Sequence, residues 1–448
     1  MKPHTQNNAT NAWNYNSQAN NNNKNNSYYV LPVFDYRIVT KGFSMCAINN
    51  DKMNNYEEST TTDMMREYVP IELIDQGYRD CCKHKGGTWG CIEYKMDYLT
   101  NNYQLYLELN SMTYEIGVSK AFCVTRPKLR EVWCSAFRDR VVHHILAIKF
   151  LPIFEGYMTD NAYACRKGKG VDYGINHLRE QIEAISEGYT KETWILRCDL
   201  SGFFMSIDRG LLYNIVEDII RKEYHEDDIE FWLWLWRKVI TNDPTKNCIK
   251  VGDLSLFGKL PKNKSLFTNE DGKGLPIGNL PSQILANLLM GIFDKWIMAR
   301  MGEGCGYGRY VDDFVCISRS KRLLLVTLSE ARNWLKVNLG LTLHPDKVYL
   351  QDARNGVQMT GAIIKPHRIY TINRTKEHLF GLIKRWNEIE NPTSEEARAF
   401  VCRCNSLLGL MIHRDTYAIR WQVWKMMRHK DIVYCENMRK ICIRKSFK

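Results

Sequence analysis

Three aspartates stand where the sequence turns from apolar to polar, and their types and spacing suit metal chemistry. Asp199 follows an apolar run in LRCDLSGFF, and Asp312 and Asp313 are adjacent in YVDDF. Neighbouring carboxylates repel each other unless a cation lies beside them. Their oxygens are the ligands that hard cations prefer. The three acids therefore predict a divalent-cation site, if the chain folds Asp199 against the Asp312–Asp313 pair.

Two such cations about 3.5–4 Å apart can activate an attacking 3′-hydroxyl and stabilise a leaving pyrophosphate, as in nucleotide polymerases. The alternative is an ordinary Asp-rich turn, and an Asp-Asp pair taken alone favours that alternative. The surrounding sequence has to decide between them.

The segments around the acids have the patterns of strands, turns and helices. WILRCDLSGFFMSID predicts a buried strand, a turn and a helix, and CGYGRYVDDFVCISRS predicts a β-hairpin with both aspartates at its turn. AFCVTRPKLREVWCSAFRDRVVHHILAIKFLPIFE predicts strand, turn, strand and helix. GLPIGNLPSQILANLLMGIFDKW predicts a loop that enters a helix, with Ser282 available near the helix start.

Further helices are predicted on both sides of this region. FWLWLWRKVI predicts a dense apolar helix, and TKEHLFGLIKRWNEI, RAFVCRCNSLLGLMI and the basic tail after them predict amphipathic helices. DYLTNNYQLYLELN also predicts a helix, with its apolar residues at Leu99, Tyr103, Tyr106 and Leu107.

Length and charge point to a multi-part protein with a polyanionic partner. The chain has 448 residues, enough for two to four substructures, and 44% hydrophobic residues, enough for a core. Its formal charge is +12, and residues 370–448 hold sixteen Lys and Arg against eight Asp and Glu, a net +8. A basic C-terminal region is typical of nucleic-acid binding, although a solvated basic surface has the same composition.

The cysteines and apolar runs bear on compartment and metals. The fifteen cysteines form no regular array, no secretory signal begins the chain, and the apolar runs fall short of a membrane span. We therefore expect reduced thiols in the cytoplasm and no membrane partner. Zinc at Cys81, Cys82, His84 and Cys91 is one interpretation, but the spacing fits no standard finger and idle thiols are the more common case.

The order of several short motifs resembles that of reverse transcriptases. DLSGFF, GLPIGNLPSQ, YVDDF, LTLHPDK and MTGAII follow one another at suitable spacing, and PKLREV and FRDRVVHHIL are similar to the fingers motifs of that superfamily. The resemblance covers roughly residues 113–371. It implies an α/β (α+β) right-hand polymerase fold with fingers, a palm of antiparallel sheet plus helices, and a thumb. The expected parts are a leader (1–33), an N-terminal extension with fingers (34–190), a palm (191–370) and a basic helical thumb (371–448).

The resemblance also implies roles for single residues. Asp199 and Asp312 would be the main ligands of two Mg²⁺ ions, with Mn²⁺ as an alternative, helped by Asp313 and the carbonyl of Leu200. Lys347 would donate a proton to the pyrophosphate, although a plain surface lysine fits as well. The residues expected to bind the deoxynucleotide are Lys128 and Arg130 (triphosphate), Phe204 (steric gate below the sugar), and Ile277 and Gly278. Those expected to support primer and template are Ser282, Gln283, Met359, Thr360 and Gly361.

One stretch points to a particular group of reverse transcriptases. GLPIGNLPSQ has Ile277-Gly278 and Ser282-Gln283 where most members have Gln-Gly and Ser-Pro. This form resembles the enzymes of prokaryotic or phage-encoded diversity-generating retroelements, which copy a template-repeat RNA into cDNA with errors at adenines. The resemblance implies RNA, primer and deoxynucleotides as partners, together with a small, basic, helical accessory protein that forms an oligomer. Isoleucine offers no side-chain hydrogen bond to an incoming nucleotide, which predicts lower fidelity.

Two other interpretations stay open. A retron or phage-defence reverse transcriptase is also short, although its motif is less like IGNLPSQ. A non-catalytic RNA-binding relic of the fold is the second, against which the three intact aspartates argue.

The N-terminus is rich in asparagine, with eleven between Asn7 and Asn26. Asparagine codons are adenine-rich, and the segment resembles the translation of a template repeat, as if the reading frame began inside one. An ordinary polar disordered leader is the alternative.

Overall fold

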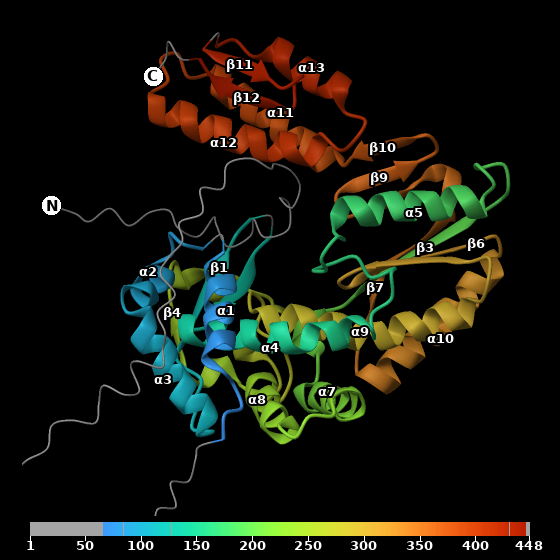
Figure 1. Cartoon of the computed structure of the whole chain (residues 1–448). Coiled ribbons are helices and arrows are strands. Elements are labelled where there is room, and N and C mark those ends of the chain that lie inside the picture. The colour runs from blue at the N-terminus through green and yellow to red at the C-terminus, as the bar shows by residue number, and fades with distance from the viewer. Residues whose placement is uncertain (1–65, 84, 127, 430, 445–448) are drawn as a thin grey trace, which may run out of the picture.

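The computed structural model describes residues 66–444 except 84, 127 and 430. The expected leader, residues 1–33, and His84 of the cysteine-rich segment therefore lie outside the described residues. The chain folds into a lobe of helices and a small sheet, a central sheet covered by helices, and a C-terminal unit beside them (Figure 1). No helix in the described part of the chain combines the length and apolar character that a membrane crossing requires.

The first lobe packs three helices against a three-stranded sheet. The helices are α1 (Ile71–Cys82), α2 (Trp89–Met96) and α3 (Tyr98–Asn110). The sheet has the order β2-β1-β4, from β2 (Arg130–Cys134), β1 (Ser119–Val124) and β4 (Cys248–Lys250). β1 and β2 form the predicted hairpin, and α4 (Phe137–Glu155) follows it as predicted. β4 comes from much later in the chain and pairs parallel to β1.

The helical prediction for α3 is confirmed, but its predicted apolar face is wrong. Leu99 and Tyr103 are 39% and 42% exposed, whereas Asn102 and Asn110 are buried with Leu105 and Leu109. Asn110 Oδ1 accepts the backbone N–H groups of residues 68 and 69 at 2.6 and 2.9 Å. Because these buried amides are hydrogen-bonded, polar residues occupy the inner face.

The central sheet is antiparallel and has the order β5-β6-β3-β7. Its strands are β5 (Gly306–Tyr310), β6 (Asp313–Ser318), β3 (Trp194–Leu200) and β7 (Leu343–Asp352). Alternate residues of β3 and β6 face opposite sides, and both sides are apolar. Leu196, Cys198 and Phe314 pack with α9 (Leu280–Met301) and α10 (Lys321–Leu339), while Ile195 and Val315 pack with α5 (Val171–Ile185). The sheet is therefore buried on both faces (Figure 1).

Shorter elements complete this body. They are α6 (Phe203–Ser206), α7 (Arg209–Glu223), α8 (Ile229–Thr241) and 3₁₀ turns η3 (Pro244–Lys246), η4 (Leu254–Lys259), η5 (Lys262–Lys264), η6 (Leu266–Thr268) and η7 (Ala353–Asn355). A second small sheet, β10-β9-β8, follows, from β8 (Val357–Met359), β9 (Ala362–Lys365) and β10 (Arg368–Thr371). Ser282 lies in the first turn of α9 but does not cap it: Asn279 holds the N-cap position, and Ser282 is only 3% exposed.

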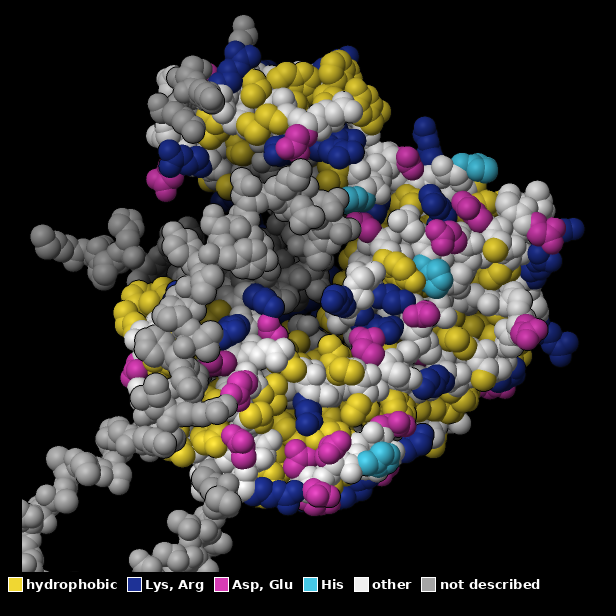
Figure 2. Space-filling model, viewed as in Figure 1, with side chains coloured by type: hydrophobic (Ala, Val, Ile, Leu, Met, Phe, Trp, Pro, Cys, Tyr) yellow, Lys and Arg dark blue, Asp and Glu magenta, His cyan; other side chains and the backbone are white. Residues whose placement is uncertain are grey.

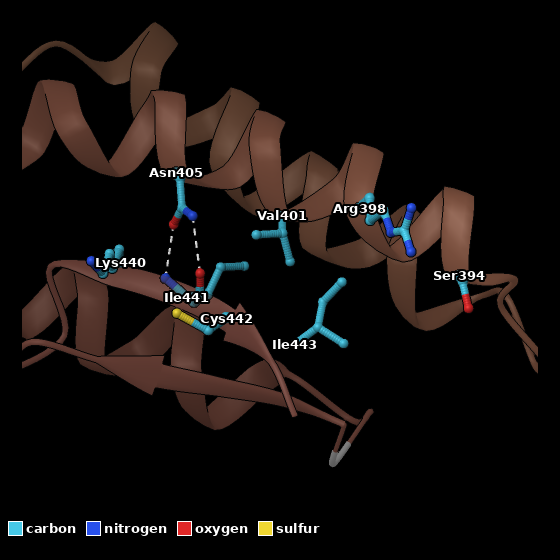
Figure 3. A pocket seen from close by; sticks show the side chains of 8 residues that line it. All are labelled: Ser394, Arg398, Val401, Asn405, Lys440, Ile441, Cys442 and Ile443. Atoms are coloured by element: carbon cyan, nitrogen blue, oxygen red, sulfur yellow. Dashed lines mark hydrogen bonds between the residues drawn. The ribbon is translucent and has the colours of Figure 1, made fainter. Parts of the chain in front are cut away.

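The C-terminal unit is not entirely helical as predicted. Its helices are α11 (Asn373–Asn387), α12 (Ser394–Met411) and α13 (Tyr417–Met426), but β11 (Ile432–Cys435) and β12 (Lys440–Ile443) form an antiparallel hairpin. Both strands of the tail contain β-branched residues, and they flank a turn in which Glu436, Asn437 and Met438 have positive φ. Asn405 of α12 holds Ile441 through two hydrogen bonds of 2.7 and 2.9 Å, beside a cavity of about 420 Å³ (Figure 3).

Candidate active site

The fold brings the three predicted acids to one end of the central sheet. Asp199, near the end of β3, lies opposite Asp313, the first residue of β6. Asp312 precedes it in the two-residue turn after β5. The predicted hairpin is confirmed, with the difference that Asp313 begins the strand. Residues more than a hundred positions apart in sequence thus share one edge.

Each outer carboxylate has a basic partner. Lys347 of β7 forms an ion pair with Asp199 through its Nζ. Arg197 of β3 places Nη2 3.1 Å from Asp313 Oδ1. Arg197 was not among the predicted site residues, although it lies two positions before Asp199 and so on the same face of the strand. These two cations offset part of the repulsion among the acids.

Among the three acids, Asp312 has no basic side chain paired with it in the described part of the chain, and burial and the neighbouring carboxylates both disfavour its charged form. Burial, together with the nearby charges of Asp199 and Asp313, raises the pKa of its carboxyl to about 7. Burial also raises the pKa of Asp313, against the lowering effect of Arg197. A cation between the carboxylates would remove this penalty, so the donor set fits a divalent metal. Within the described residues, however, no three His, Cys, Asp or Glu side chains are arranged as a metal cluster, because Asp199 and Asp313 turn toward Lys347 and Arg197.

The turn that carries Asp312 is held by a buried ion pair below it. Val311 has φ 60°, a conformation that β-branched residues rarely adopt. Its carbonyl accepts a 2.9 Å hydrogen bond from Nη1 of Arg309, whose Nε and Nη2 each lie 2.7 Å from the Asp294 carboxylate of α9. Both side chains are almost completely buried. Sequence reasoning missed this pair, although an acid in an apolar helix and an arginine in an apolar strand are the signals of one.

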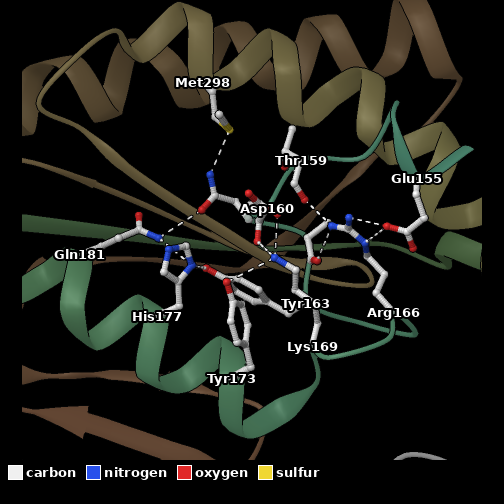
Figure 4. Close-up of polar contacts among 12 residues, drawn as sticks. Glu155, Thr159, Asp160, Tyr163, Arg166, Lys169, Tyr173, His177, Gln181 and Met298 are labelled. Carbon is white, nitrogen blue, oxygen red and sulfur yellow. Dashed lines mark hydrogen bonds and ion pairs between the residues drawn. The ribbon is translucent and has the colours of Figure 1, made fainter. Parts of the chain in front are cut away.

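A polar network supports the outer strand of the hairpin (Figure 4). Tyr163 N–H donates to the Arg309 carbonyl at 2.9 Å, and Gln181 of α5 donates to the Tyr307 carbonyl at 3.1 Å. In the same segment Arg166 forms an ion pair with Glu155. The free edge of β5 is therefore covered by residues between α4 and α5.

Three of the five predicted nucleotide-contacting residues, Phe204, Ile277 and Gly278, lie on the side of the β1–β2 sheet that faces α6. Phe204 and Ile277 are half-buried around one apolar cluster with Trp133 and Leu266, whereas Phe203 is core, as expected, at 3% exposure. Ile277 accepts a 2.8 Å hydrogen bond from Trp133 N–H through its carbonyl. Gly278 has φ 119°, and a Cβ there would lie 2.4 Å from the Trp133 carbonyl oxygen, so only glycine fits.

The remaining predicted residues lie at separate places. Lys128 is exposed in the β1–β2 turn, and Arg130 begins β2. Leu200 is buried at the end of β3, and Gln283 is half-buried in the first turn of α9. Thr360 and Gly361, with φ 45° and 84°, form the tight turn after Met359 between β8 and β9.

The cysteine-rich segment shows no zinc geometry in the part that the structure describes. Cys82 and Cys91 place their sulfurs 3.6 Å apart, and Cys81 is buried. Burial raises the pKa of Cys81 and that of Cys82 to about 11, which favours neutral thiols.

The helix-covered antiparallel sheet, with a strand-and-helix lobe on one side and a mostly helical unit on the other, is the right-hand polymerase fold that the sequence predicts. A family model described as "Reverse transcriptase (RNA-dependent DNA polymerase)" matches residues 125–364. The chain therefore belongs to the reverse transcriptase family and is an RNA-directed DNA polymerase.

Individual relatives are more distant. Protein YkfC of Escherichia coli (strain K12) is 24% identical over 314 residues, which are 63% of this chain and 72% of that protein. An apo telomerase structure from Candida tropicalis has a TM-score of 0.44 and 12% identity over 69% of this chain and 56% of that one. A telomerase structure from Candida albicans in complex with the TWJ fragment of telomeric RNA has a TM-score of 0.41 and 10% identity, over 70% and 56%. The match thus spans little more than half of each telomerase chain.

Proposed function

We propose that the edge formed by Asp199, Asp312 and Asp313 is the polymerisation site, where two bound Mg²⁺ ions would supply activation of the primer 3′-hydroxyl. Asp199 and Asp312 would hold the ions with help from the Leu200 carbonyl, and Asp313, paired with Arg197, would support them. Lys347, already beside Asp199, is placed to protonate the leaving pyrophosphate. The meeting of three carboxylates at one end of the central sheet, with Asp199 opposite Asp313 and Asp312 next to it in the chain, is the observation that carries this proposal.

The test is RNA-templated primer extension by Asp312→Ala. We expect loss of extension with template–primer binding retained, because the substitution removes a ligand and no fold contact. Asp346→Ala, an exposed aspartate of the same region, is the control. Equal extension by Asp312→Ala and the parent would refute the metal role and would favour a non-catalytic RNA-binding protein.

The remaining predicted residues are assigned to the substrates. Lys128 and Arg130 bind the triphosphate, because arginine suits bidentate phosphate contact and lysine supplies a point charge. Phe204 lies below the deoxyribose as a steric gate, held through its carbonyl by the Leu275 N–H at 2.8 Å. Gln283 and the Met359–Gly361 turn support the primer–template.

We further propose that the enzyme copies a template-repeat RNA into adenine-mutagenised cDNA, as in diversity-generating retroelements. The Ile277-Gly278 and Ser282-Gln283 pattern carries this proposal. Ile277 lies in the same apolar cluster as Phe204, so its side chain presents no hydrogen-bonding group near the gate. An oligomeric basic accessory protein completes the proposed assembly.

The test is to measure how often the Ile277→Gln variant misincorporates opposite each template base. Glutamine restores a donor and an acceptor worth about 1–2 kcal/mol, so errors opposite adenine should fall roughly tenfold. Ile277→Val keeps an apolar side chain and should keep the parent error rate. An unchanged adenine error rate in Ile277→Gln would rule out this role and leave a retron or phage-defence enzyme as the better interpretation.

A further inference from the structure

A second concave site lies on the opposite face of the β1–β2 sheet from Phe204 and Ile277. It is a cavity of about 670 Å³ between that sheet, α2, α3 and the start of α4, here called the N-terminal pocket. Along β1, Lys120 and Phe122 face this pocket, while the alternate residue Ala121 packs in the cluster with Trp133. The sheet therefore separates the pocket from the proposed nucleotide site.

The pocket has an excess of positive charge. Its charged lining residues in the described part of the chain are Lys85, Lys120, Arg138, Arg140 and Glu93. Arg138 is neutralised by an ion pair with Glu108. Lys120 and Arg140 then lie with a single lining acid, Glu93. Burial lowers the pKa of Lys85, Cys81 acts in the opposite direction, and the charge of Arg140 adds to the lowering.

Arg140 is held in a setting that suits an anion. Its guanidinium lies 4.9 Å from the centre of the Phe137 ring. Its Nε is buried without a hydrogen-bond partner in the described structure. A Cβ at Gly90 would come within 3.2 Å of Nη2, so the absence of a side chain there leaves room for the guanidinium. A half-buried guanidinium that lines the pocket favours a phosphate ligand.

Aromatic and amide groups complete the lining. Trp89, the first residue of α2, is 76% exposed at the rim, and Tyr94 and Phe122 line the wall. Asn101 and Gln104 supply side-chain amides from α3. Figure 2 shows apolar side chains at the surface on this side of the molecule, over α2. Aromatic rings for stacking beside basic groups for phosphates are the two features of single-strand binding sites.

We propose that the N-terminal pocket binds single-stranded RNA outside the catalytic cleft, with a base against its aromatic residues and a phosphate at Arg140 and Lys120. The proposal rests on the RNA-templated function, since it names a second contact for the same RNA. The pocket is a walled cavity with cations inside it, which fits an RNA strand better than a flat membrane surface or an apolar helix.

The test is binding of a short fluorescein-labelled oligouridylate by Lys120→Glu and Trp89→Ala, followed by fluorescence anisotropy. Both residues are exposed, so neither change should alter the melting temperature. Loss of a stacked base or a phosphate contact should weaken binding about tenfold. Lys95→Glu is the matched control, because Lys95 is exposed on α2 but does not line the pocket.

Unchanged oligouridylate affinity in both variants would overturn the proposal, as would an equal loss in Lys95→Glu, which would indicate non-specific charge. Loss of binding to phosphatidylserine vesicles with RNA affinity kept would also overturn it. Extension of a short template–primer duplex should be unchanged in both pocket variants. Failure of the proposed function would instead appear as absent extension in the parent enzyme, whichever way the oligouridylate result falls.

Discussion

The Arg309 guanidinium lies inside the protein between α9 and the turn that carries Asp312. It meets the Asp294 carboxylate with two nitrogens and the Val311 carbonyl with a third. Tyr307 also donates to Asp294, at 2.6 Å. A buried carboxylate and guanidinium tolerate desolvation only when their hydrogen bonds are satisfied, as they are here. The third hydrogen bond of the guanidinium goes to the carbonyl of Val311, the residue with positive φ, so the ion pair also holds the turn in place.

We therefore expect Arg309→Lys to lower both stability and extension. Lysine keeps the charge, but its single ammonium group cannot make the bidentate contact with Asp294 and also donate to the Val311 carbonyl. The free energy of unfolding should fall by about 2–4 kcal/mol, measured by denaturant titration. Arg354→Lys is the control, because the Arg354–Asp352 pair is on the surface and should change stability by less than about 1 kcal/mol. Equal effects of the two substitutions would contradict the buried role.

At the scale of elements, α4 buries His143 and leaves its neighbour His144 half-buried. Burial lowers the pKa of His143 to about 3 and that of His144 to about 4. A lowered pKa means that the folded state keeps these rings neutral, while the unfolded chain binds protons below about pH 6.5. Their contribution to stability is therefore complete above pH 6.5 and is lost as pH falls toward 3.

At pH 5 we expect His143 alone to have lost about 2 kcal/mol relative to pH 7. Melting temperature measured from pH 7 to pH 5 should fall steeply in the parent and less steeply in His143→Gln. His225→Gln alters an exposed histidine and should leave the slope unchanged. A parent slope equal to that of His143→Gln would show that His143 does not titrate as stated.

The loop before α9 makes a second prediction at this scale. Gly278→Ala would place a Cβ against the Trp133 carbonyl and 3.1 Å from Val132. The loop cannot move aside without losing the Trp133-to-Ile277 hydrogen bond. We expect kcat/KM for single-nucleotide addition to fall about tenfold or more. A misplaced loop that raises the activation free energy by about 1.4 kcal/mol is enough for that decrease. Gly258→Ala, where a Cβ meets open space, should behave as the parent.

Local patterns predicted the elements near the three acids and failed where polar contacts decide. Apolar runs bounded by turn residues predict β3 and the β5–β6 hairpin, because β3 and β6 are apolar on both faces. The inner face of α3 was not predictable, because buried Asn102 and Asn110 are hydrogen-bonded to partners distant in sequence. For the same reason the Arg309–Asp294 pair and the Arg197–Asp313 contact were not predicted, because each joins residues of different elements. The final hairpin was missed because its amphipathic residues fit a helical pattern as well.

At the scale of the whole molecule, the loop between α12 and α13 contacts the central body in the described structure. Asp415, between α12 and α13, exchanges two hydrogen bonds with Ile369 of β10: its N–H donates at 2.9 Å, and its carboxylate accepts at 2.8 Å. The neighbouring Arg414 forms an ion pair with Asp172 of α5, with Nη2 2.7 Å from Oδ1. The basic C-terminal unit is thus tied to the body on the same side as α5.

Asp415→Ala should loosen this junction without touching the acids at the sheet edge. If the C-terminal unit holds the template–primer by phosphate contacts, a looser unit should dissociate sooner. Products made in a single binding event, with excess unlabelled template–primer as a trap, should become several-fold shorter, while addition of the first nucleotide at saturating substrate stays at the parent rate. Asp415→Asn keeps one acceptor for Ile369 and should restore most of the product length. Full-length products from Asp415→Ala under the trap would show that this junction does not control how long the enzyme stays on its template.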